Sequence, residues 1–478
     1  MIHGNDTITA VATGVGGAIS LIRVSGPESI AICDSVFQAA SGNKLTDAKG
    51  YTIHYGMIIR NDGDPIDDVL VSVFKAPHSY TGEDMVEISC HGSRYIQQQI
   101  VNLLLDKGAR SAEAGEFTIR AFLAGKMDLS QAEAVADIIA STDQATHALA
   151  INQMRGGYSS AFEHLRERLL NMASLIELEL DFGEEEVEFA DRTQLLSLAG
   201  EIKSKITSLL DSFKHGNAFK EGIAIAIIGE PNVGKSTLLN TFLKDDRAMV
   251  SDIAGTTRDV IEESIVIKGV RFRFIDTAGI RETDDVLEKM GIERTFTSIS
   301  KANIVLLMVE PGTDAKETAT KITKALSNIT LIPTQTLCIL LNKSDQYGLG
   351  ATEEYPAAID CKQIAGYLQS EYAGVTILPI SAKNNLNIDL VIDFLYDTSD
   401  AESLYRGDVI VSNSRHYEAL SRAAASIAQV EAGILNGIPS DLIAQDIRET
   451  LHYLGMITGE ITTDEILGNI FSKFCIGK

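Results

Sequence analysis

A glycine-rich stretch, Gly229-Glu-Pro-Asn-Val-Gly-Lys-Ser-Thr237, has the residue types and spacing that bind a phosphate chain. It follows an apolar run at 223–228 that is typical of a buried strand, and a helix-like segment begins at its end. The two glycines let the backbone bend until several N–H groups face one phosphate, and the helix N-terminus adds partial positive charge. Lys235 would reach the β- and γ-phosphates, and the Ser236 hydroxyl would bind Mg2+. The spacing therefore predicts a P-loop, because a chance glycine-rich turn would not combine strand, loop, lysine, serine and helix.

Two further motifs suit the phosphate side of a nucleotide site. Gly255-Thr-Thr-Arg-Asp259 offers Thr257, which would close on Mg2+ and the γ-phosphate. Asp276-Thr-Ala-Gly279 follows a predicted strand. Its aspartate would hold Mg2+ through water, and the N–H of Gly279 would contact the γ-phosphate until hydrolysis.

Two more motifs suit the base. Asn342-Lys-Ser-Asp345 follows another predicted strand, and Asp345 would accept hydrogen bonds from N1–H and the 2-amino group of guanine. Adenine lacks this donor pair, so the motif predicts specificity for GTP. Ser381-Ala-Lys383 would complete the base pocket. The predicted nucleotide site comprises Asn232, Val233, Gly234, Lys235, Ser236, Thr237, Ser251, Asp252, Ile253, Ala254, Gly255, Thr256, Thr257, Asp276, Thr277, Ala278, Gly279, Asn342, Lys343, Asp345, Ser381, Ala382 and Lys383.

The expected hydrolytic machinery departs from that of Ras-like GTPases. Ile280 stands where those proteins carry the glutamine that orients the attacking water, and an isoleucine side chain cannot do so. Arg258 is a weak candidate for an arginine finger, a group that contributes about 10^3–10^5 in rate. Another positive charge is expected in its place.

These motifs require a fold of several parts, and a chain of 478 residues predicts roughly three domains. We expect an α+β domain at 1–126, a helical domain at 127–217 and 396–478, and a Ras-like α/β P-loop GTPase domain inserted at 218–395. Within the helical region, residues 131–154 and 193–213 each predict one long helix.

The composition limits the possible partners. The formal charge is −25, with 66 acidic and 41 basic residues, so the chain alone is a poor nonspecific binder of nucleic acid. An RNA substrate would need a basic partner to hold it. The five cysteines form no C-x-x-C pair, which favours a reducing cytoplasm and disfavours a zinc site. No signal peptide or membrane-spanning stretch is evident, so a cytoplasmic protein without membrane contact is expected.

Several of these residues also resemble a known family. Asn232 within the P-loop, Gly255-Thr-Thr-Arg-Asp259 and the C-terminal Phe474-Cys-Ile-Gly-Lys478 are similar to the MnmE (TrmE) family of tRNA-modification GTPases. The resemblance extends over essentially the whole chain. In the first domain it includes the motifs Ser79-Tyr-Thr-Gly-Glu-Asp84, Gly115-Glu-Phe117 and Gly125-Lys-Met-Asp-Leu129.

The resemblance implies a potassium ion in place of the arginine finger. Asn232 would bind K+ through its side chain, and oxygens of Ser251, Ile253 and Thr256 would complete the site, closed by two facing G domains of a homodimer. The family usually has threonine at position 251, and serine keeps the oxygen. The sequence alone favours a solvated helix residue at Glu288, whereas the resemblance implies that Glu288 is the family's catalytic glutamate.

The resemblance also implies a tetrahydrofolate site in the first domain, at the dimer interface. The matching residues are Arg23, Glu87, Lys126 and Lys478. A carboxylate suits the pterin donors and basic groups suit the glutamate tail, but without the resemblance each residue is better explained as an ordinary strand-face or helix-end charge. Cys475 is either a small buried residue or a participant in the chemistry.

The reaction follows from the resemblance alone. With an FAD-dependent partner, MnmG (GidA), in a heterotetramer, the protein would modify C5 of the wobble uridine of certain tRNAs. Glycine would give carboxymethylaminomethyl and ammonium would give aminomethyl, with the carbon supplied by 5-formyl- or 5,10-methylene-tetrahydrofolate. The partner would hold most of the tRNA. Two alternatives are a regulatory GTPase in ribosome assembly and a folate enzyme whose G domain binds nucleotide without turnover.

Overall fold

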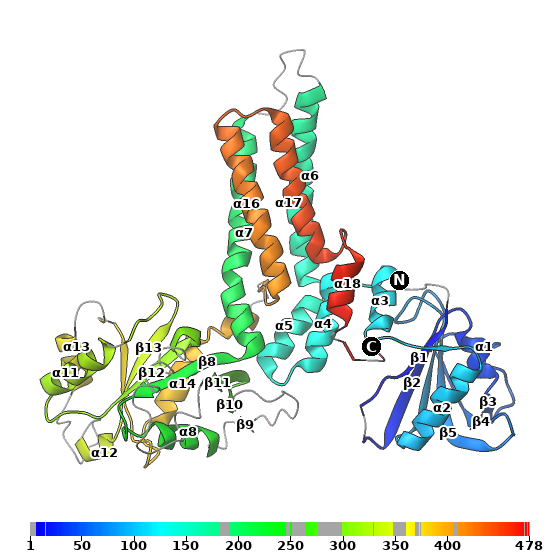
Figure 1. The fold of residues 1–478 in the computed structure, drawn as a ribbon, viewed down its shortest axis with the longest axis horizontal. Coiled ribbons are helices and arrows are strands. Elements are labelled where there is room, and N and C mark those ends of the chain that lie inside the picture. The colour runs from blue at the N-terminus through cyan, green and yellow to red at the C-terminus, as the bar shows by residue number, and fades with distance from the viewer. Residues whose placement is uncertain are drawn as a thin grey trace. The chain divides into compact units, whose positions relative to one another are not determined.

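The computed structural model describes residues 6–14, 16–181, 192–244, 249–250, 263–275, 299–327, 329–347, 360–368, 372, 374–405, 409–472, 474–475 and 477. The chain divides into two compact units. One comprises Met1–Ile139, Gln153–Leu196 and Gln429–Lys478, and the other comprises Ala140–Asn152 and Ser197–Ala428. Figure 1 shows the elements of each unit.

The first unit contains a seven-stranded sheet with the order β3-β4-β5-β6-β2-β1-β7. All described pairs are antiparallel except β1 with β7. Alternation sets the faces: Val69, Val71 and Val73 are buried, whereas Leu70 between them is exposed. The strands are β1 (Ile8–Val11), β2 (Ile19–Ser25), β3 (Phe37–Ala39), β4 (Thr52–Ile59), β5 (Pro65–Phe74), β6 (Met85–His91) and β7 (Arg110–Ser111). Helices α1 (Ser29–Asp34) and α2 (Arg94–Asp106) contribute apolar side chains to the same core.

Helices form the remainder of the first unit. They include α3 (Glu116–Leu123), α4 (Leu129–Ala140), α6 (Gly157–Asp181), α17 (Ser440–Thr458) and α18 (Asp464–Phe471). Helix α6 packs along α17 (Figure 1). Side chains of α3, α4 and α18 share one apolar cluster, in which Phe471 and Phe474 lie against Ile119, Leu129 and Val135. Two long helices, α7 (Arg192–Glu221) and α16 (Ser414–Leu435), contribute residues to both units.

The second unit contains a sheet with the order β14-β13-β12-β8-β11-β10-β9. Strands β8, β11, β12, β13 and β14 are parallel, and β10 and β9 are antiparallel additions at one edge. The strands are β8 (Ile223–Gly229), β9 (Met249–Val250), β10 (Glu263–Ile267), β11 (Val270–Phe274), β12 (Ile304–Val309), β13 (Thr336–Leu341) and β14 (Thr376–Pro379). Its helices include α8 (Lys235–Lys244), α11 (Ala315–Leu326), α12 (Ser344–Tyr347), α13 (Cys361–Tyr367), α14 (Ile388–Thr398) and α15 (Glu402–Tyr405).

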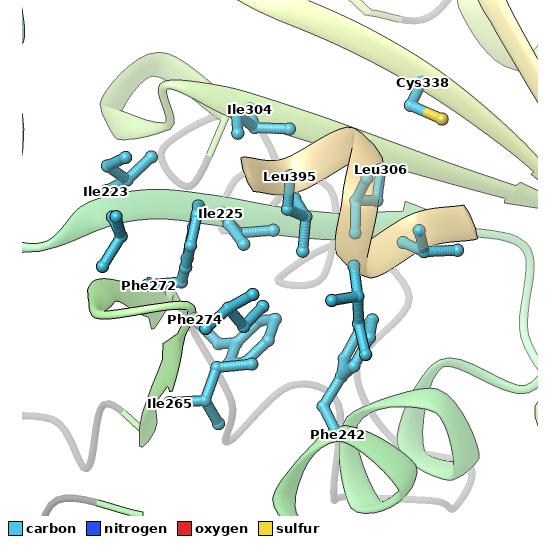
Figure 2. Packing of buried hydrophobic residues seen from close by; sticks show 14 of the residues in the cluster. Ile223, Ile225, Phe242, Ile265, Phe272, Phe274, Ile304, Leu306, Cys338 and Leu395 are labelled. Carbon is cyan, nitrogen blue, oxygen red and sulfur yellow. The ribbon is translucent and has the colours of Figure 1, made fainter. Parts of the chain in front are cut away.

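Both faces of this sheet are buried, as a parallel sheet between helices requires. Along β8, Ile223, Ile225 and Ile227 enter one apolar cluster with α8 and α14. The ring of Phe242 from α8 stacks on that of Phe274, and Figure 2 shows Leu395 from α14 between Ile225 and Leu306. The alternate residues Ala224, Ala226 and Ile228 enter a second cluster with α11 and α13. The predicted fold class is confirmed: an α+β domain, a helical domain and an inserted Ras-like α/β P-loop domain.

Two helix predictions were wrong. Residues 131–154 form two helices, α4 and α5 (Gln144–Met154), rather than one. The break is stabilised by a local cap, in which Asp143 Oδ1 accepts the N–H of Thr146 at 2.9 Å, and by a tertiary contact, in which Gly269 O accepts the N–H of Ala145 at 3.0 Å. The second helix was predicted to end at Phe213, but α7 continues to Glu221.

Candidate functional site

The predicted P-loop lies between β8 and α8, at the carboxyl end of the parallel sheet. Strand β8 has β11 on one side and β12 on the other, so the chain leaves it where the strand order reverses, the usual ligand position in such sheets. Gly229 has φ +149°, and a Cβ there would lie 2.3 Å from Met308 O. Gly234 has φ +105°, and its Cβ would lie 2.3 Å from Asn342 Nδ2. Both positions therefore require glycine.

Lys235 lies in the first turn of α8 with its ammonium turned into the loop. Its Nζ donates to Gly229 O at 2.8 Å and to Glu230 O at 2.9 Å. Burial lowers the pKa of Lys235. The loop therefore holds a cation at low dielectric, where an anionic phosphate would be a better partner than two carbonyl oxygens.

Asn342 joins the P-loop to the base-side loops. Its Nδ2 donates to Val233 O at 2.7 Å, and its Oδ1 accepts the N–H of Ala382 at 2.9 Å. Thr241 of α8 donates to the carbonyl oxygen of Ala382 at 3.0 Å. Since the Asn342 side chain is buried, these bonds form in a low dielectric and fix the loops relative to one another.

The remaining base-side residues surround the same loops. Asp345 lies in the short helix α12, which follows β13, and its Oδ2 accepts from Asn384 Nδ2 at 2.9 Å. Lys343 has φ +64° and pairs through Nζ with Glu310. Ser381 follows β14 and bridges to Leu386 in a tight loop that also exposes Lys383.

The structure thus brings together three of the predicted nucleotide motifs: the P-loop with Ser236 and Thr237, the 342–345 loop and the 381–383 loop. The other predicted residues of the G domain lie outside the described residues, namely Ser251, Asp252, Ile253, Ala254, Gly255, Thr256, Thr257, Arg258, Asp276, Thr277, Ala278, Gly279, Ile280 and Glu288. Sequence reasoning missed Thr241 and Asn384, because neither belongs to a motif of fixed spacing. Each acts by donating a hydrogen bond to a residue of another loop, Ala382 and Asp345 respectively, and only the fold brings these partners together.

In the first unit, Arg23 and Glu87 face each other across β2 and β6. The Nε and Nη2 atoms of Arg23 both donate to Glu87 Oε1, at 2.9 and 2.7 Å. The Arg23 guanidinium carbon lies 5.2 Å from the centroid of the Tyr80 ring and 5.5 Å from that of Phe117. Both rings lie in motifs that carry the family resemblance, but the sequence assigned neither of them a role.

The C-terminal tail reaches the same place. Gly477 O accepts from Arg23 Nη1 at 3.4 Å, and a Cβ on Gly477, which has φ +98°, would lie 2.4 Å from Val11 O. Cys475 is exposed, so its interpretation as a buried residue was wrong. Lys126 is exposed beside Gly82, and Lys478 lies outside the described residues.

The described residues contain no group of three or more His, Cys, Asp or Glu side chains placed to hold a metal ion. In the same part of the chain, no helix is long and apolar enough to cross a membrane.

A glycine loop at the reversal point of a parallel sheet, tied to an Asn-Lys-Ser-Asp loop, defines the class of P-loop GTPases. Comparison with known proteins identifies the family. Residues 7–126 match the model of the GTP-binding protein TrmE N-terminus, and residues 129–475 match the MnmE helical domain. The chain belongs to the MnmE family.

Curated relatives extend along the entire chain, and each is named tRNA modification GTPase MnmE. The relative from Flavobacterium johnsoniae is 50% identical over 476 residues, which are 99% of this chain and 99% of that protein. Those from Flavobacterium psychrophilum and Bacteroides thetaiotaomicron are each 51% identical, again over 99% of both chains.

Proposed function

We propose that this protein is a GTP hydrolase of tRNA modification, activated by potassium and by pairing of two G domains. With an FAD-dependent partner, MnmG (GidA), it installs carboxymethylaminomethyl or aminomethyl at C5 of the wobble uridine of certain tRNAs. The observation that carries the proposal is the likeness over 99% of the chain to proteins named tRNA modification GTPase. We further propose that the protein acts in the cytoplasm and that the partner holds most of the tRNA, since this chain has a formal charge of −25 and repels phosphate backbones.

The geometry of the P-loop supports GTP binding. Lys235 is held where it can exchange its two carbonyl partners for phosphate oxygens. Asp345 is restrained through Oδ2 by Asn384, beside loops that Asn342 holds together. Ser236 in the first turn of α8, with Thr257, would hold Mg2+, which neutralises charge on the phosphates.

Asn232 supports the potassium proposal. It has φ +62° at the exposed tip of the P-loop, and its side chain has no hydrogen-bond partner among the described residues. Its amide oxygen is a hard ligand that suits a cation such as K+. Ser251, Ile253 and Thr256 would supply the other oxygens, and the ion would supply the positive charge that an arginine finger supplies elsewhere. Glu288 is proposed as the residue that positions the attacking water.

The Arg23–Glu87 pair supports a one-carbon site. Glu87 Oε1 accepts both bonds from Arg23, and Oε2 accepts none from the described residues. That oxygen is therefore open to the N–H donors of a pterin, and Lys126 and Lys478 would face the glutamate tail of the tetrahydrofolate.

The proposed domain boundaries are a folate-binding and dimerisation domain at 1–126, a helical domain at 127–217 and 396–478, and a G domain at 218–395.

Two experiments test this function. In the first, GTP hydrolysis by the wild type and by Asn232→Ala is measured in KCl and in NaCl. We expect KCl to activate the wild type but not the variant. Equal wild-type rates in both salts would refute the potassium site. Nucleosides of tRNA are analysed from cells lacking the protein. Unchanged wobble uridines would favour the alternative, a regulatory GTPase in ribosome assembly.

A further inference from the structure

The Arg23 side chain is held by more than its ion pair. Its guanidinium lies over the rings of Tyr80 and Phe117, and its side chain is 13% exposed. Contact with an aromatic face restricts the plane of a guanidinium and gains cation–π energy. The plane in turn decides which carboxylate oxygen Arg23 occupies.

The position of the Tyr80 ring is fixed from one side by α3. Its hydroxyl and that of Thr118 are 2.9 Å apart, and Thr118 is fully buried. The neighbouring residue on the helix is Phe117, also fully buried. One helix therefore supplies the second ring and also anchors the first.

The loop that carries Tyr80 is fixed from the other side by a buried ionic network. Glu83 Oε2 accepts from Ser25 at 2.7 Å, and Glu83 Oε1 accepts from Arg120 Nη1 at 3.1 Å. Ser25 lies two residues beyond Arg23 on β2, on the same face of the strand. The loop that carries Tyr80 is thus tied to β2, the strand that carries Arg23.

We propose that Tyr80 is a positioning residue of the one-carbon site, acting through Arg23. Its ring keeps the guanidinium in the plane that directs both Nε and Nη2 to Glu87 Oε1, which leaves Glu87 Oε2 open to a ligand donor. The inference rests on the proposed folate site, and it adds a residue that determines the orientation of the pair.

Calorimetric binding of 5-formyltetrahydrofolate to the full-length chain tests the proposal. Tyr80→Leu and Tyr80→Met remove the aromatic face, and both are expected to weaken binding about 10-fold, the size of a largely desolvated cation–π contact. Tyr80→Phe keeps the ring and is expected to stay within about threefold of the wild type. Tyr95→Leu, at an exposed tyrosine of α2, is the matched control and is expected to leave binding unchanged. A melting temperature close to that of the wild type shows that each variant is folded.

A double-mutant cycle separates positioning from a structural role. Arg23→Lys keeps the charge but lacks the planar group that the ring orients. In that background Tyr80→Leu is expected to weaken binding less than twofold, because the two changes act through one contact. A full 10-fold loss in both backgrounds, or a Phe variant as weak as the Leu variant, would overturn the proposal.

Crystallography decides the inference independently of folate. In ligand-free Tyr80→Leu, the Arg23 guanidinium is expected to leave its paired contact with Glu87 Oε1; retention of both bonds would disprove positioning. Failure of the wild type to bind 5-formyltetrahydrofolate would instead remove the proposed folate site, while the crystal structure still tests the role of Tyr80.

Discussion

The side-chain amide of Asn342 lies 2.7 Å from the carbonyl oxygen of Val233, 109 positions earlier in the chain. The same side chain accepts the N–H of Ala382 through its other polar atom. One buried residue at the end of β13 therefore holds the phosphate loop and a base-side loop in a fixed relation. In the proposed nucleotide site, this contact would couple guanine recognition to phosphate binding before any nucleotide arrives.

Asn342→Ala is expected to weaken GDP binding about 30- to 10^4-fold. It leaves Val233 O and the Ala382 N–H without their buried partners, at about 1–3 kcal/mol for each group. Displacement of a fluorescent GDP gives the affinity. Asn303→Ala is the matched control, because Asn303 Oδ1 accepts the N–H of Ala224 at the opposite end of β8. It should lower the melting temperature with little effect on affinity; equal losses of affinity in the two variants would contradict the coupling.

Asp345→Asn is expected to exchange guanine specificity for xanthine specificity. In the proposed site the carboxylate would accept from N1–H and the 2-amino group of guanine, whereas an amide would donate to the 2-oxo group of xanthine. Loss of two charged hydrogen bonds, at about 1.5–3 kcal/mol each, predicts that GDP binds about 10^2- to 10^4-fold more weakly. Competition between GDP and xanthosine diphosphate measures the change. Asn384→Ala is the control, because it only removes the hydrogen bond to Asp345 Oδ2. It should lower GDP affinity a few-fold and leave the preference for GDP over xanthosine diphosphate unchanged. A retained preference for GDP in Asp345→Asn would disprove the assignment.

The fold class was predictable because the two sheets differ in the pattern of apolar residues along their strands: β5 alternates buried and exposed residues, whereas β8 is apolar throughout. The run at 223–228 is continuously apolar, and the structure buries it on both faces, in two separate clusters. The helix break at 141–143 was missed because apolar periodicity registers neither the local cap at Asp143 nor partners more than 100 residues away. Asp143 caps α5, and its Oδ2 lies 3.8 Å from Arg271 Nε. The carbonyl oxygen of Gly269 accepts the N–H of Ala145. Local periodicity carries no information about such contacts.

The candidate sites were predictable where chemistry demands fixed spacing and not where contacts cross the fold. Lys235 and Asp345 stand in motifs whose spacing reflects one bound molecule. Tyr80 and Phe117 also stand in quoted motifs, but their shared partner, Arg23, is visible only once β2 and α3 are placed together. The spacing of the residues along the chain therefore could not reveal this contact.

Lys235→Met tests the charge in the P-loop. Burial lowers the pKa of Lys235 below its ordinary value of 10.5, so the unfolded chain binds more protons than the folded chain between the two values. The wild type therefore gains stability relative to the variant as pH rises toward 10.5, and the difference in melting temperature should shift in its favour between pH 7 and pH 10. Calorimetry without nucleotide measures this, and a difference independent of pH would contradict it. GDP should stabilise the wild type and leave Lys235→Met unchanged.

Glu116→Gln tests the buried ionic network behind the Tyr80 loop. Burial acts to raise the pKa of Glu116, but hydrogen bonds from Arg110, the N–H of Glu113 and Arg120 outweigh it, and the net pKa lies below the ordinary 4.5. The unfolded chain therefore takes up a proton first as pH falls. The stabilisation is complete above about pH 4.5 and disappears as pH falls through the folded pKa.

The glutamine variant removes this dependence and leaves two arginines with a neutral partner. Its melting temperature should be lower than that of the wild type at pH 7, by an amount that shrinks as pH falls below about 4.5. Differential scanning calorimetry suits the measurement, because the chain contains no tryptophan. Glu113→Gln is the matched control: it keeps the backbone N–H that Glu116 accepts, and its own side chain is exposed. A melting difference between Glu116→Gln and the wild type that is the same at pH 7 and pH 4 would show that the carboxylate charge contributes nothing to the network.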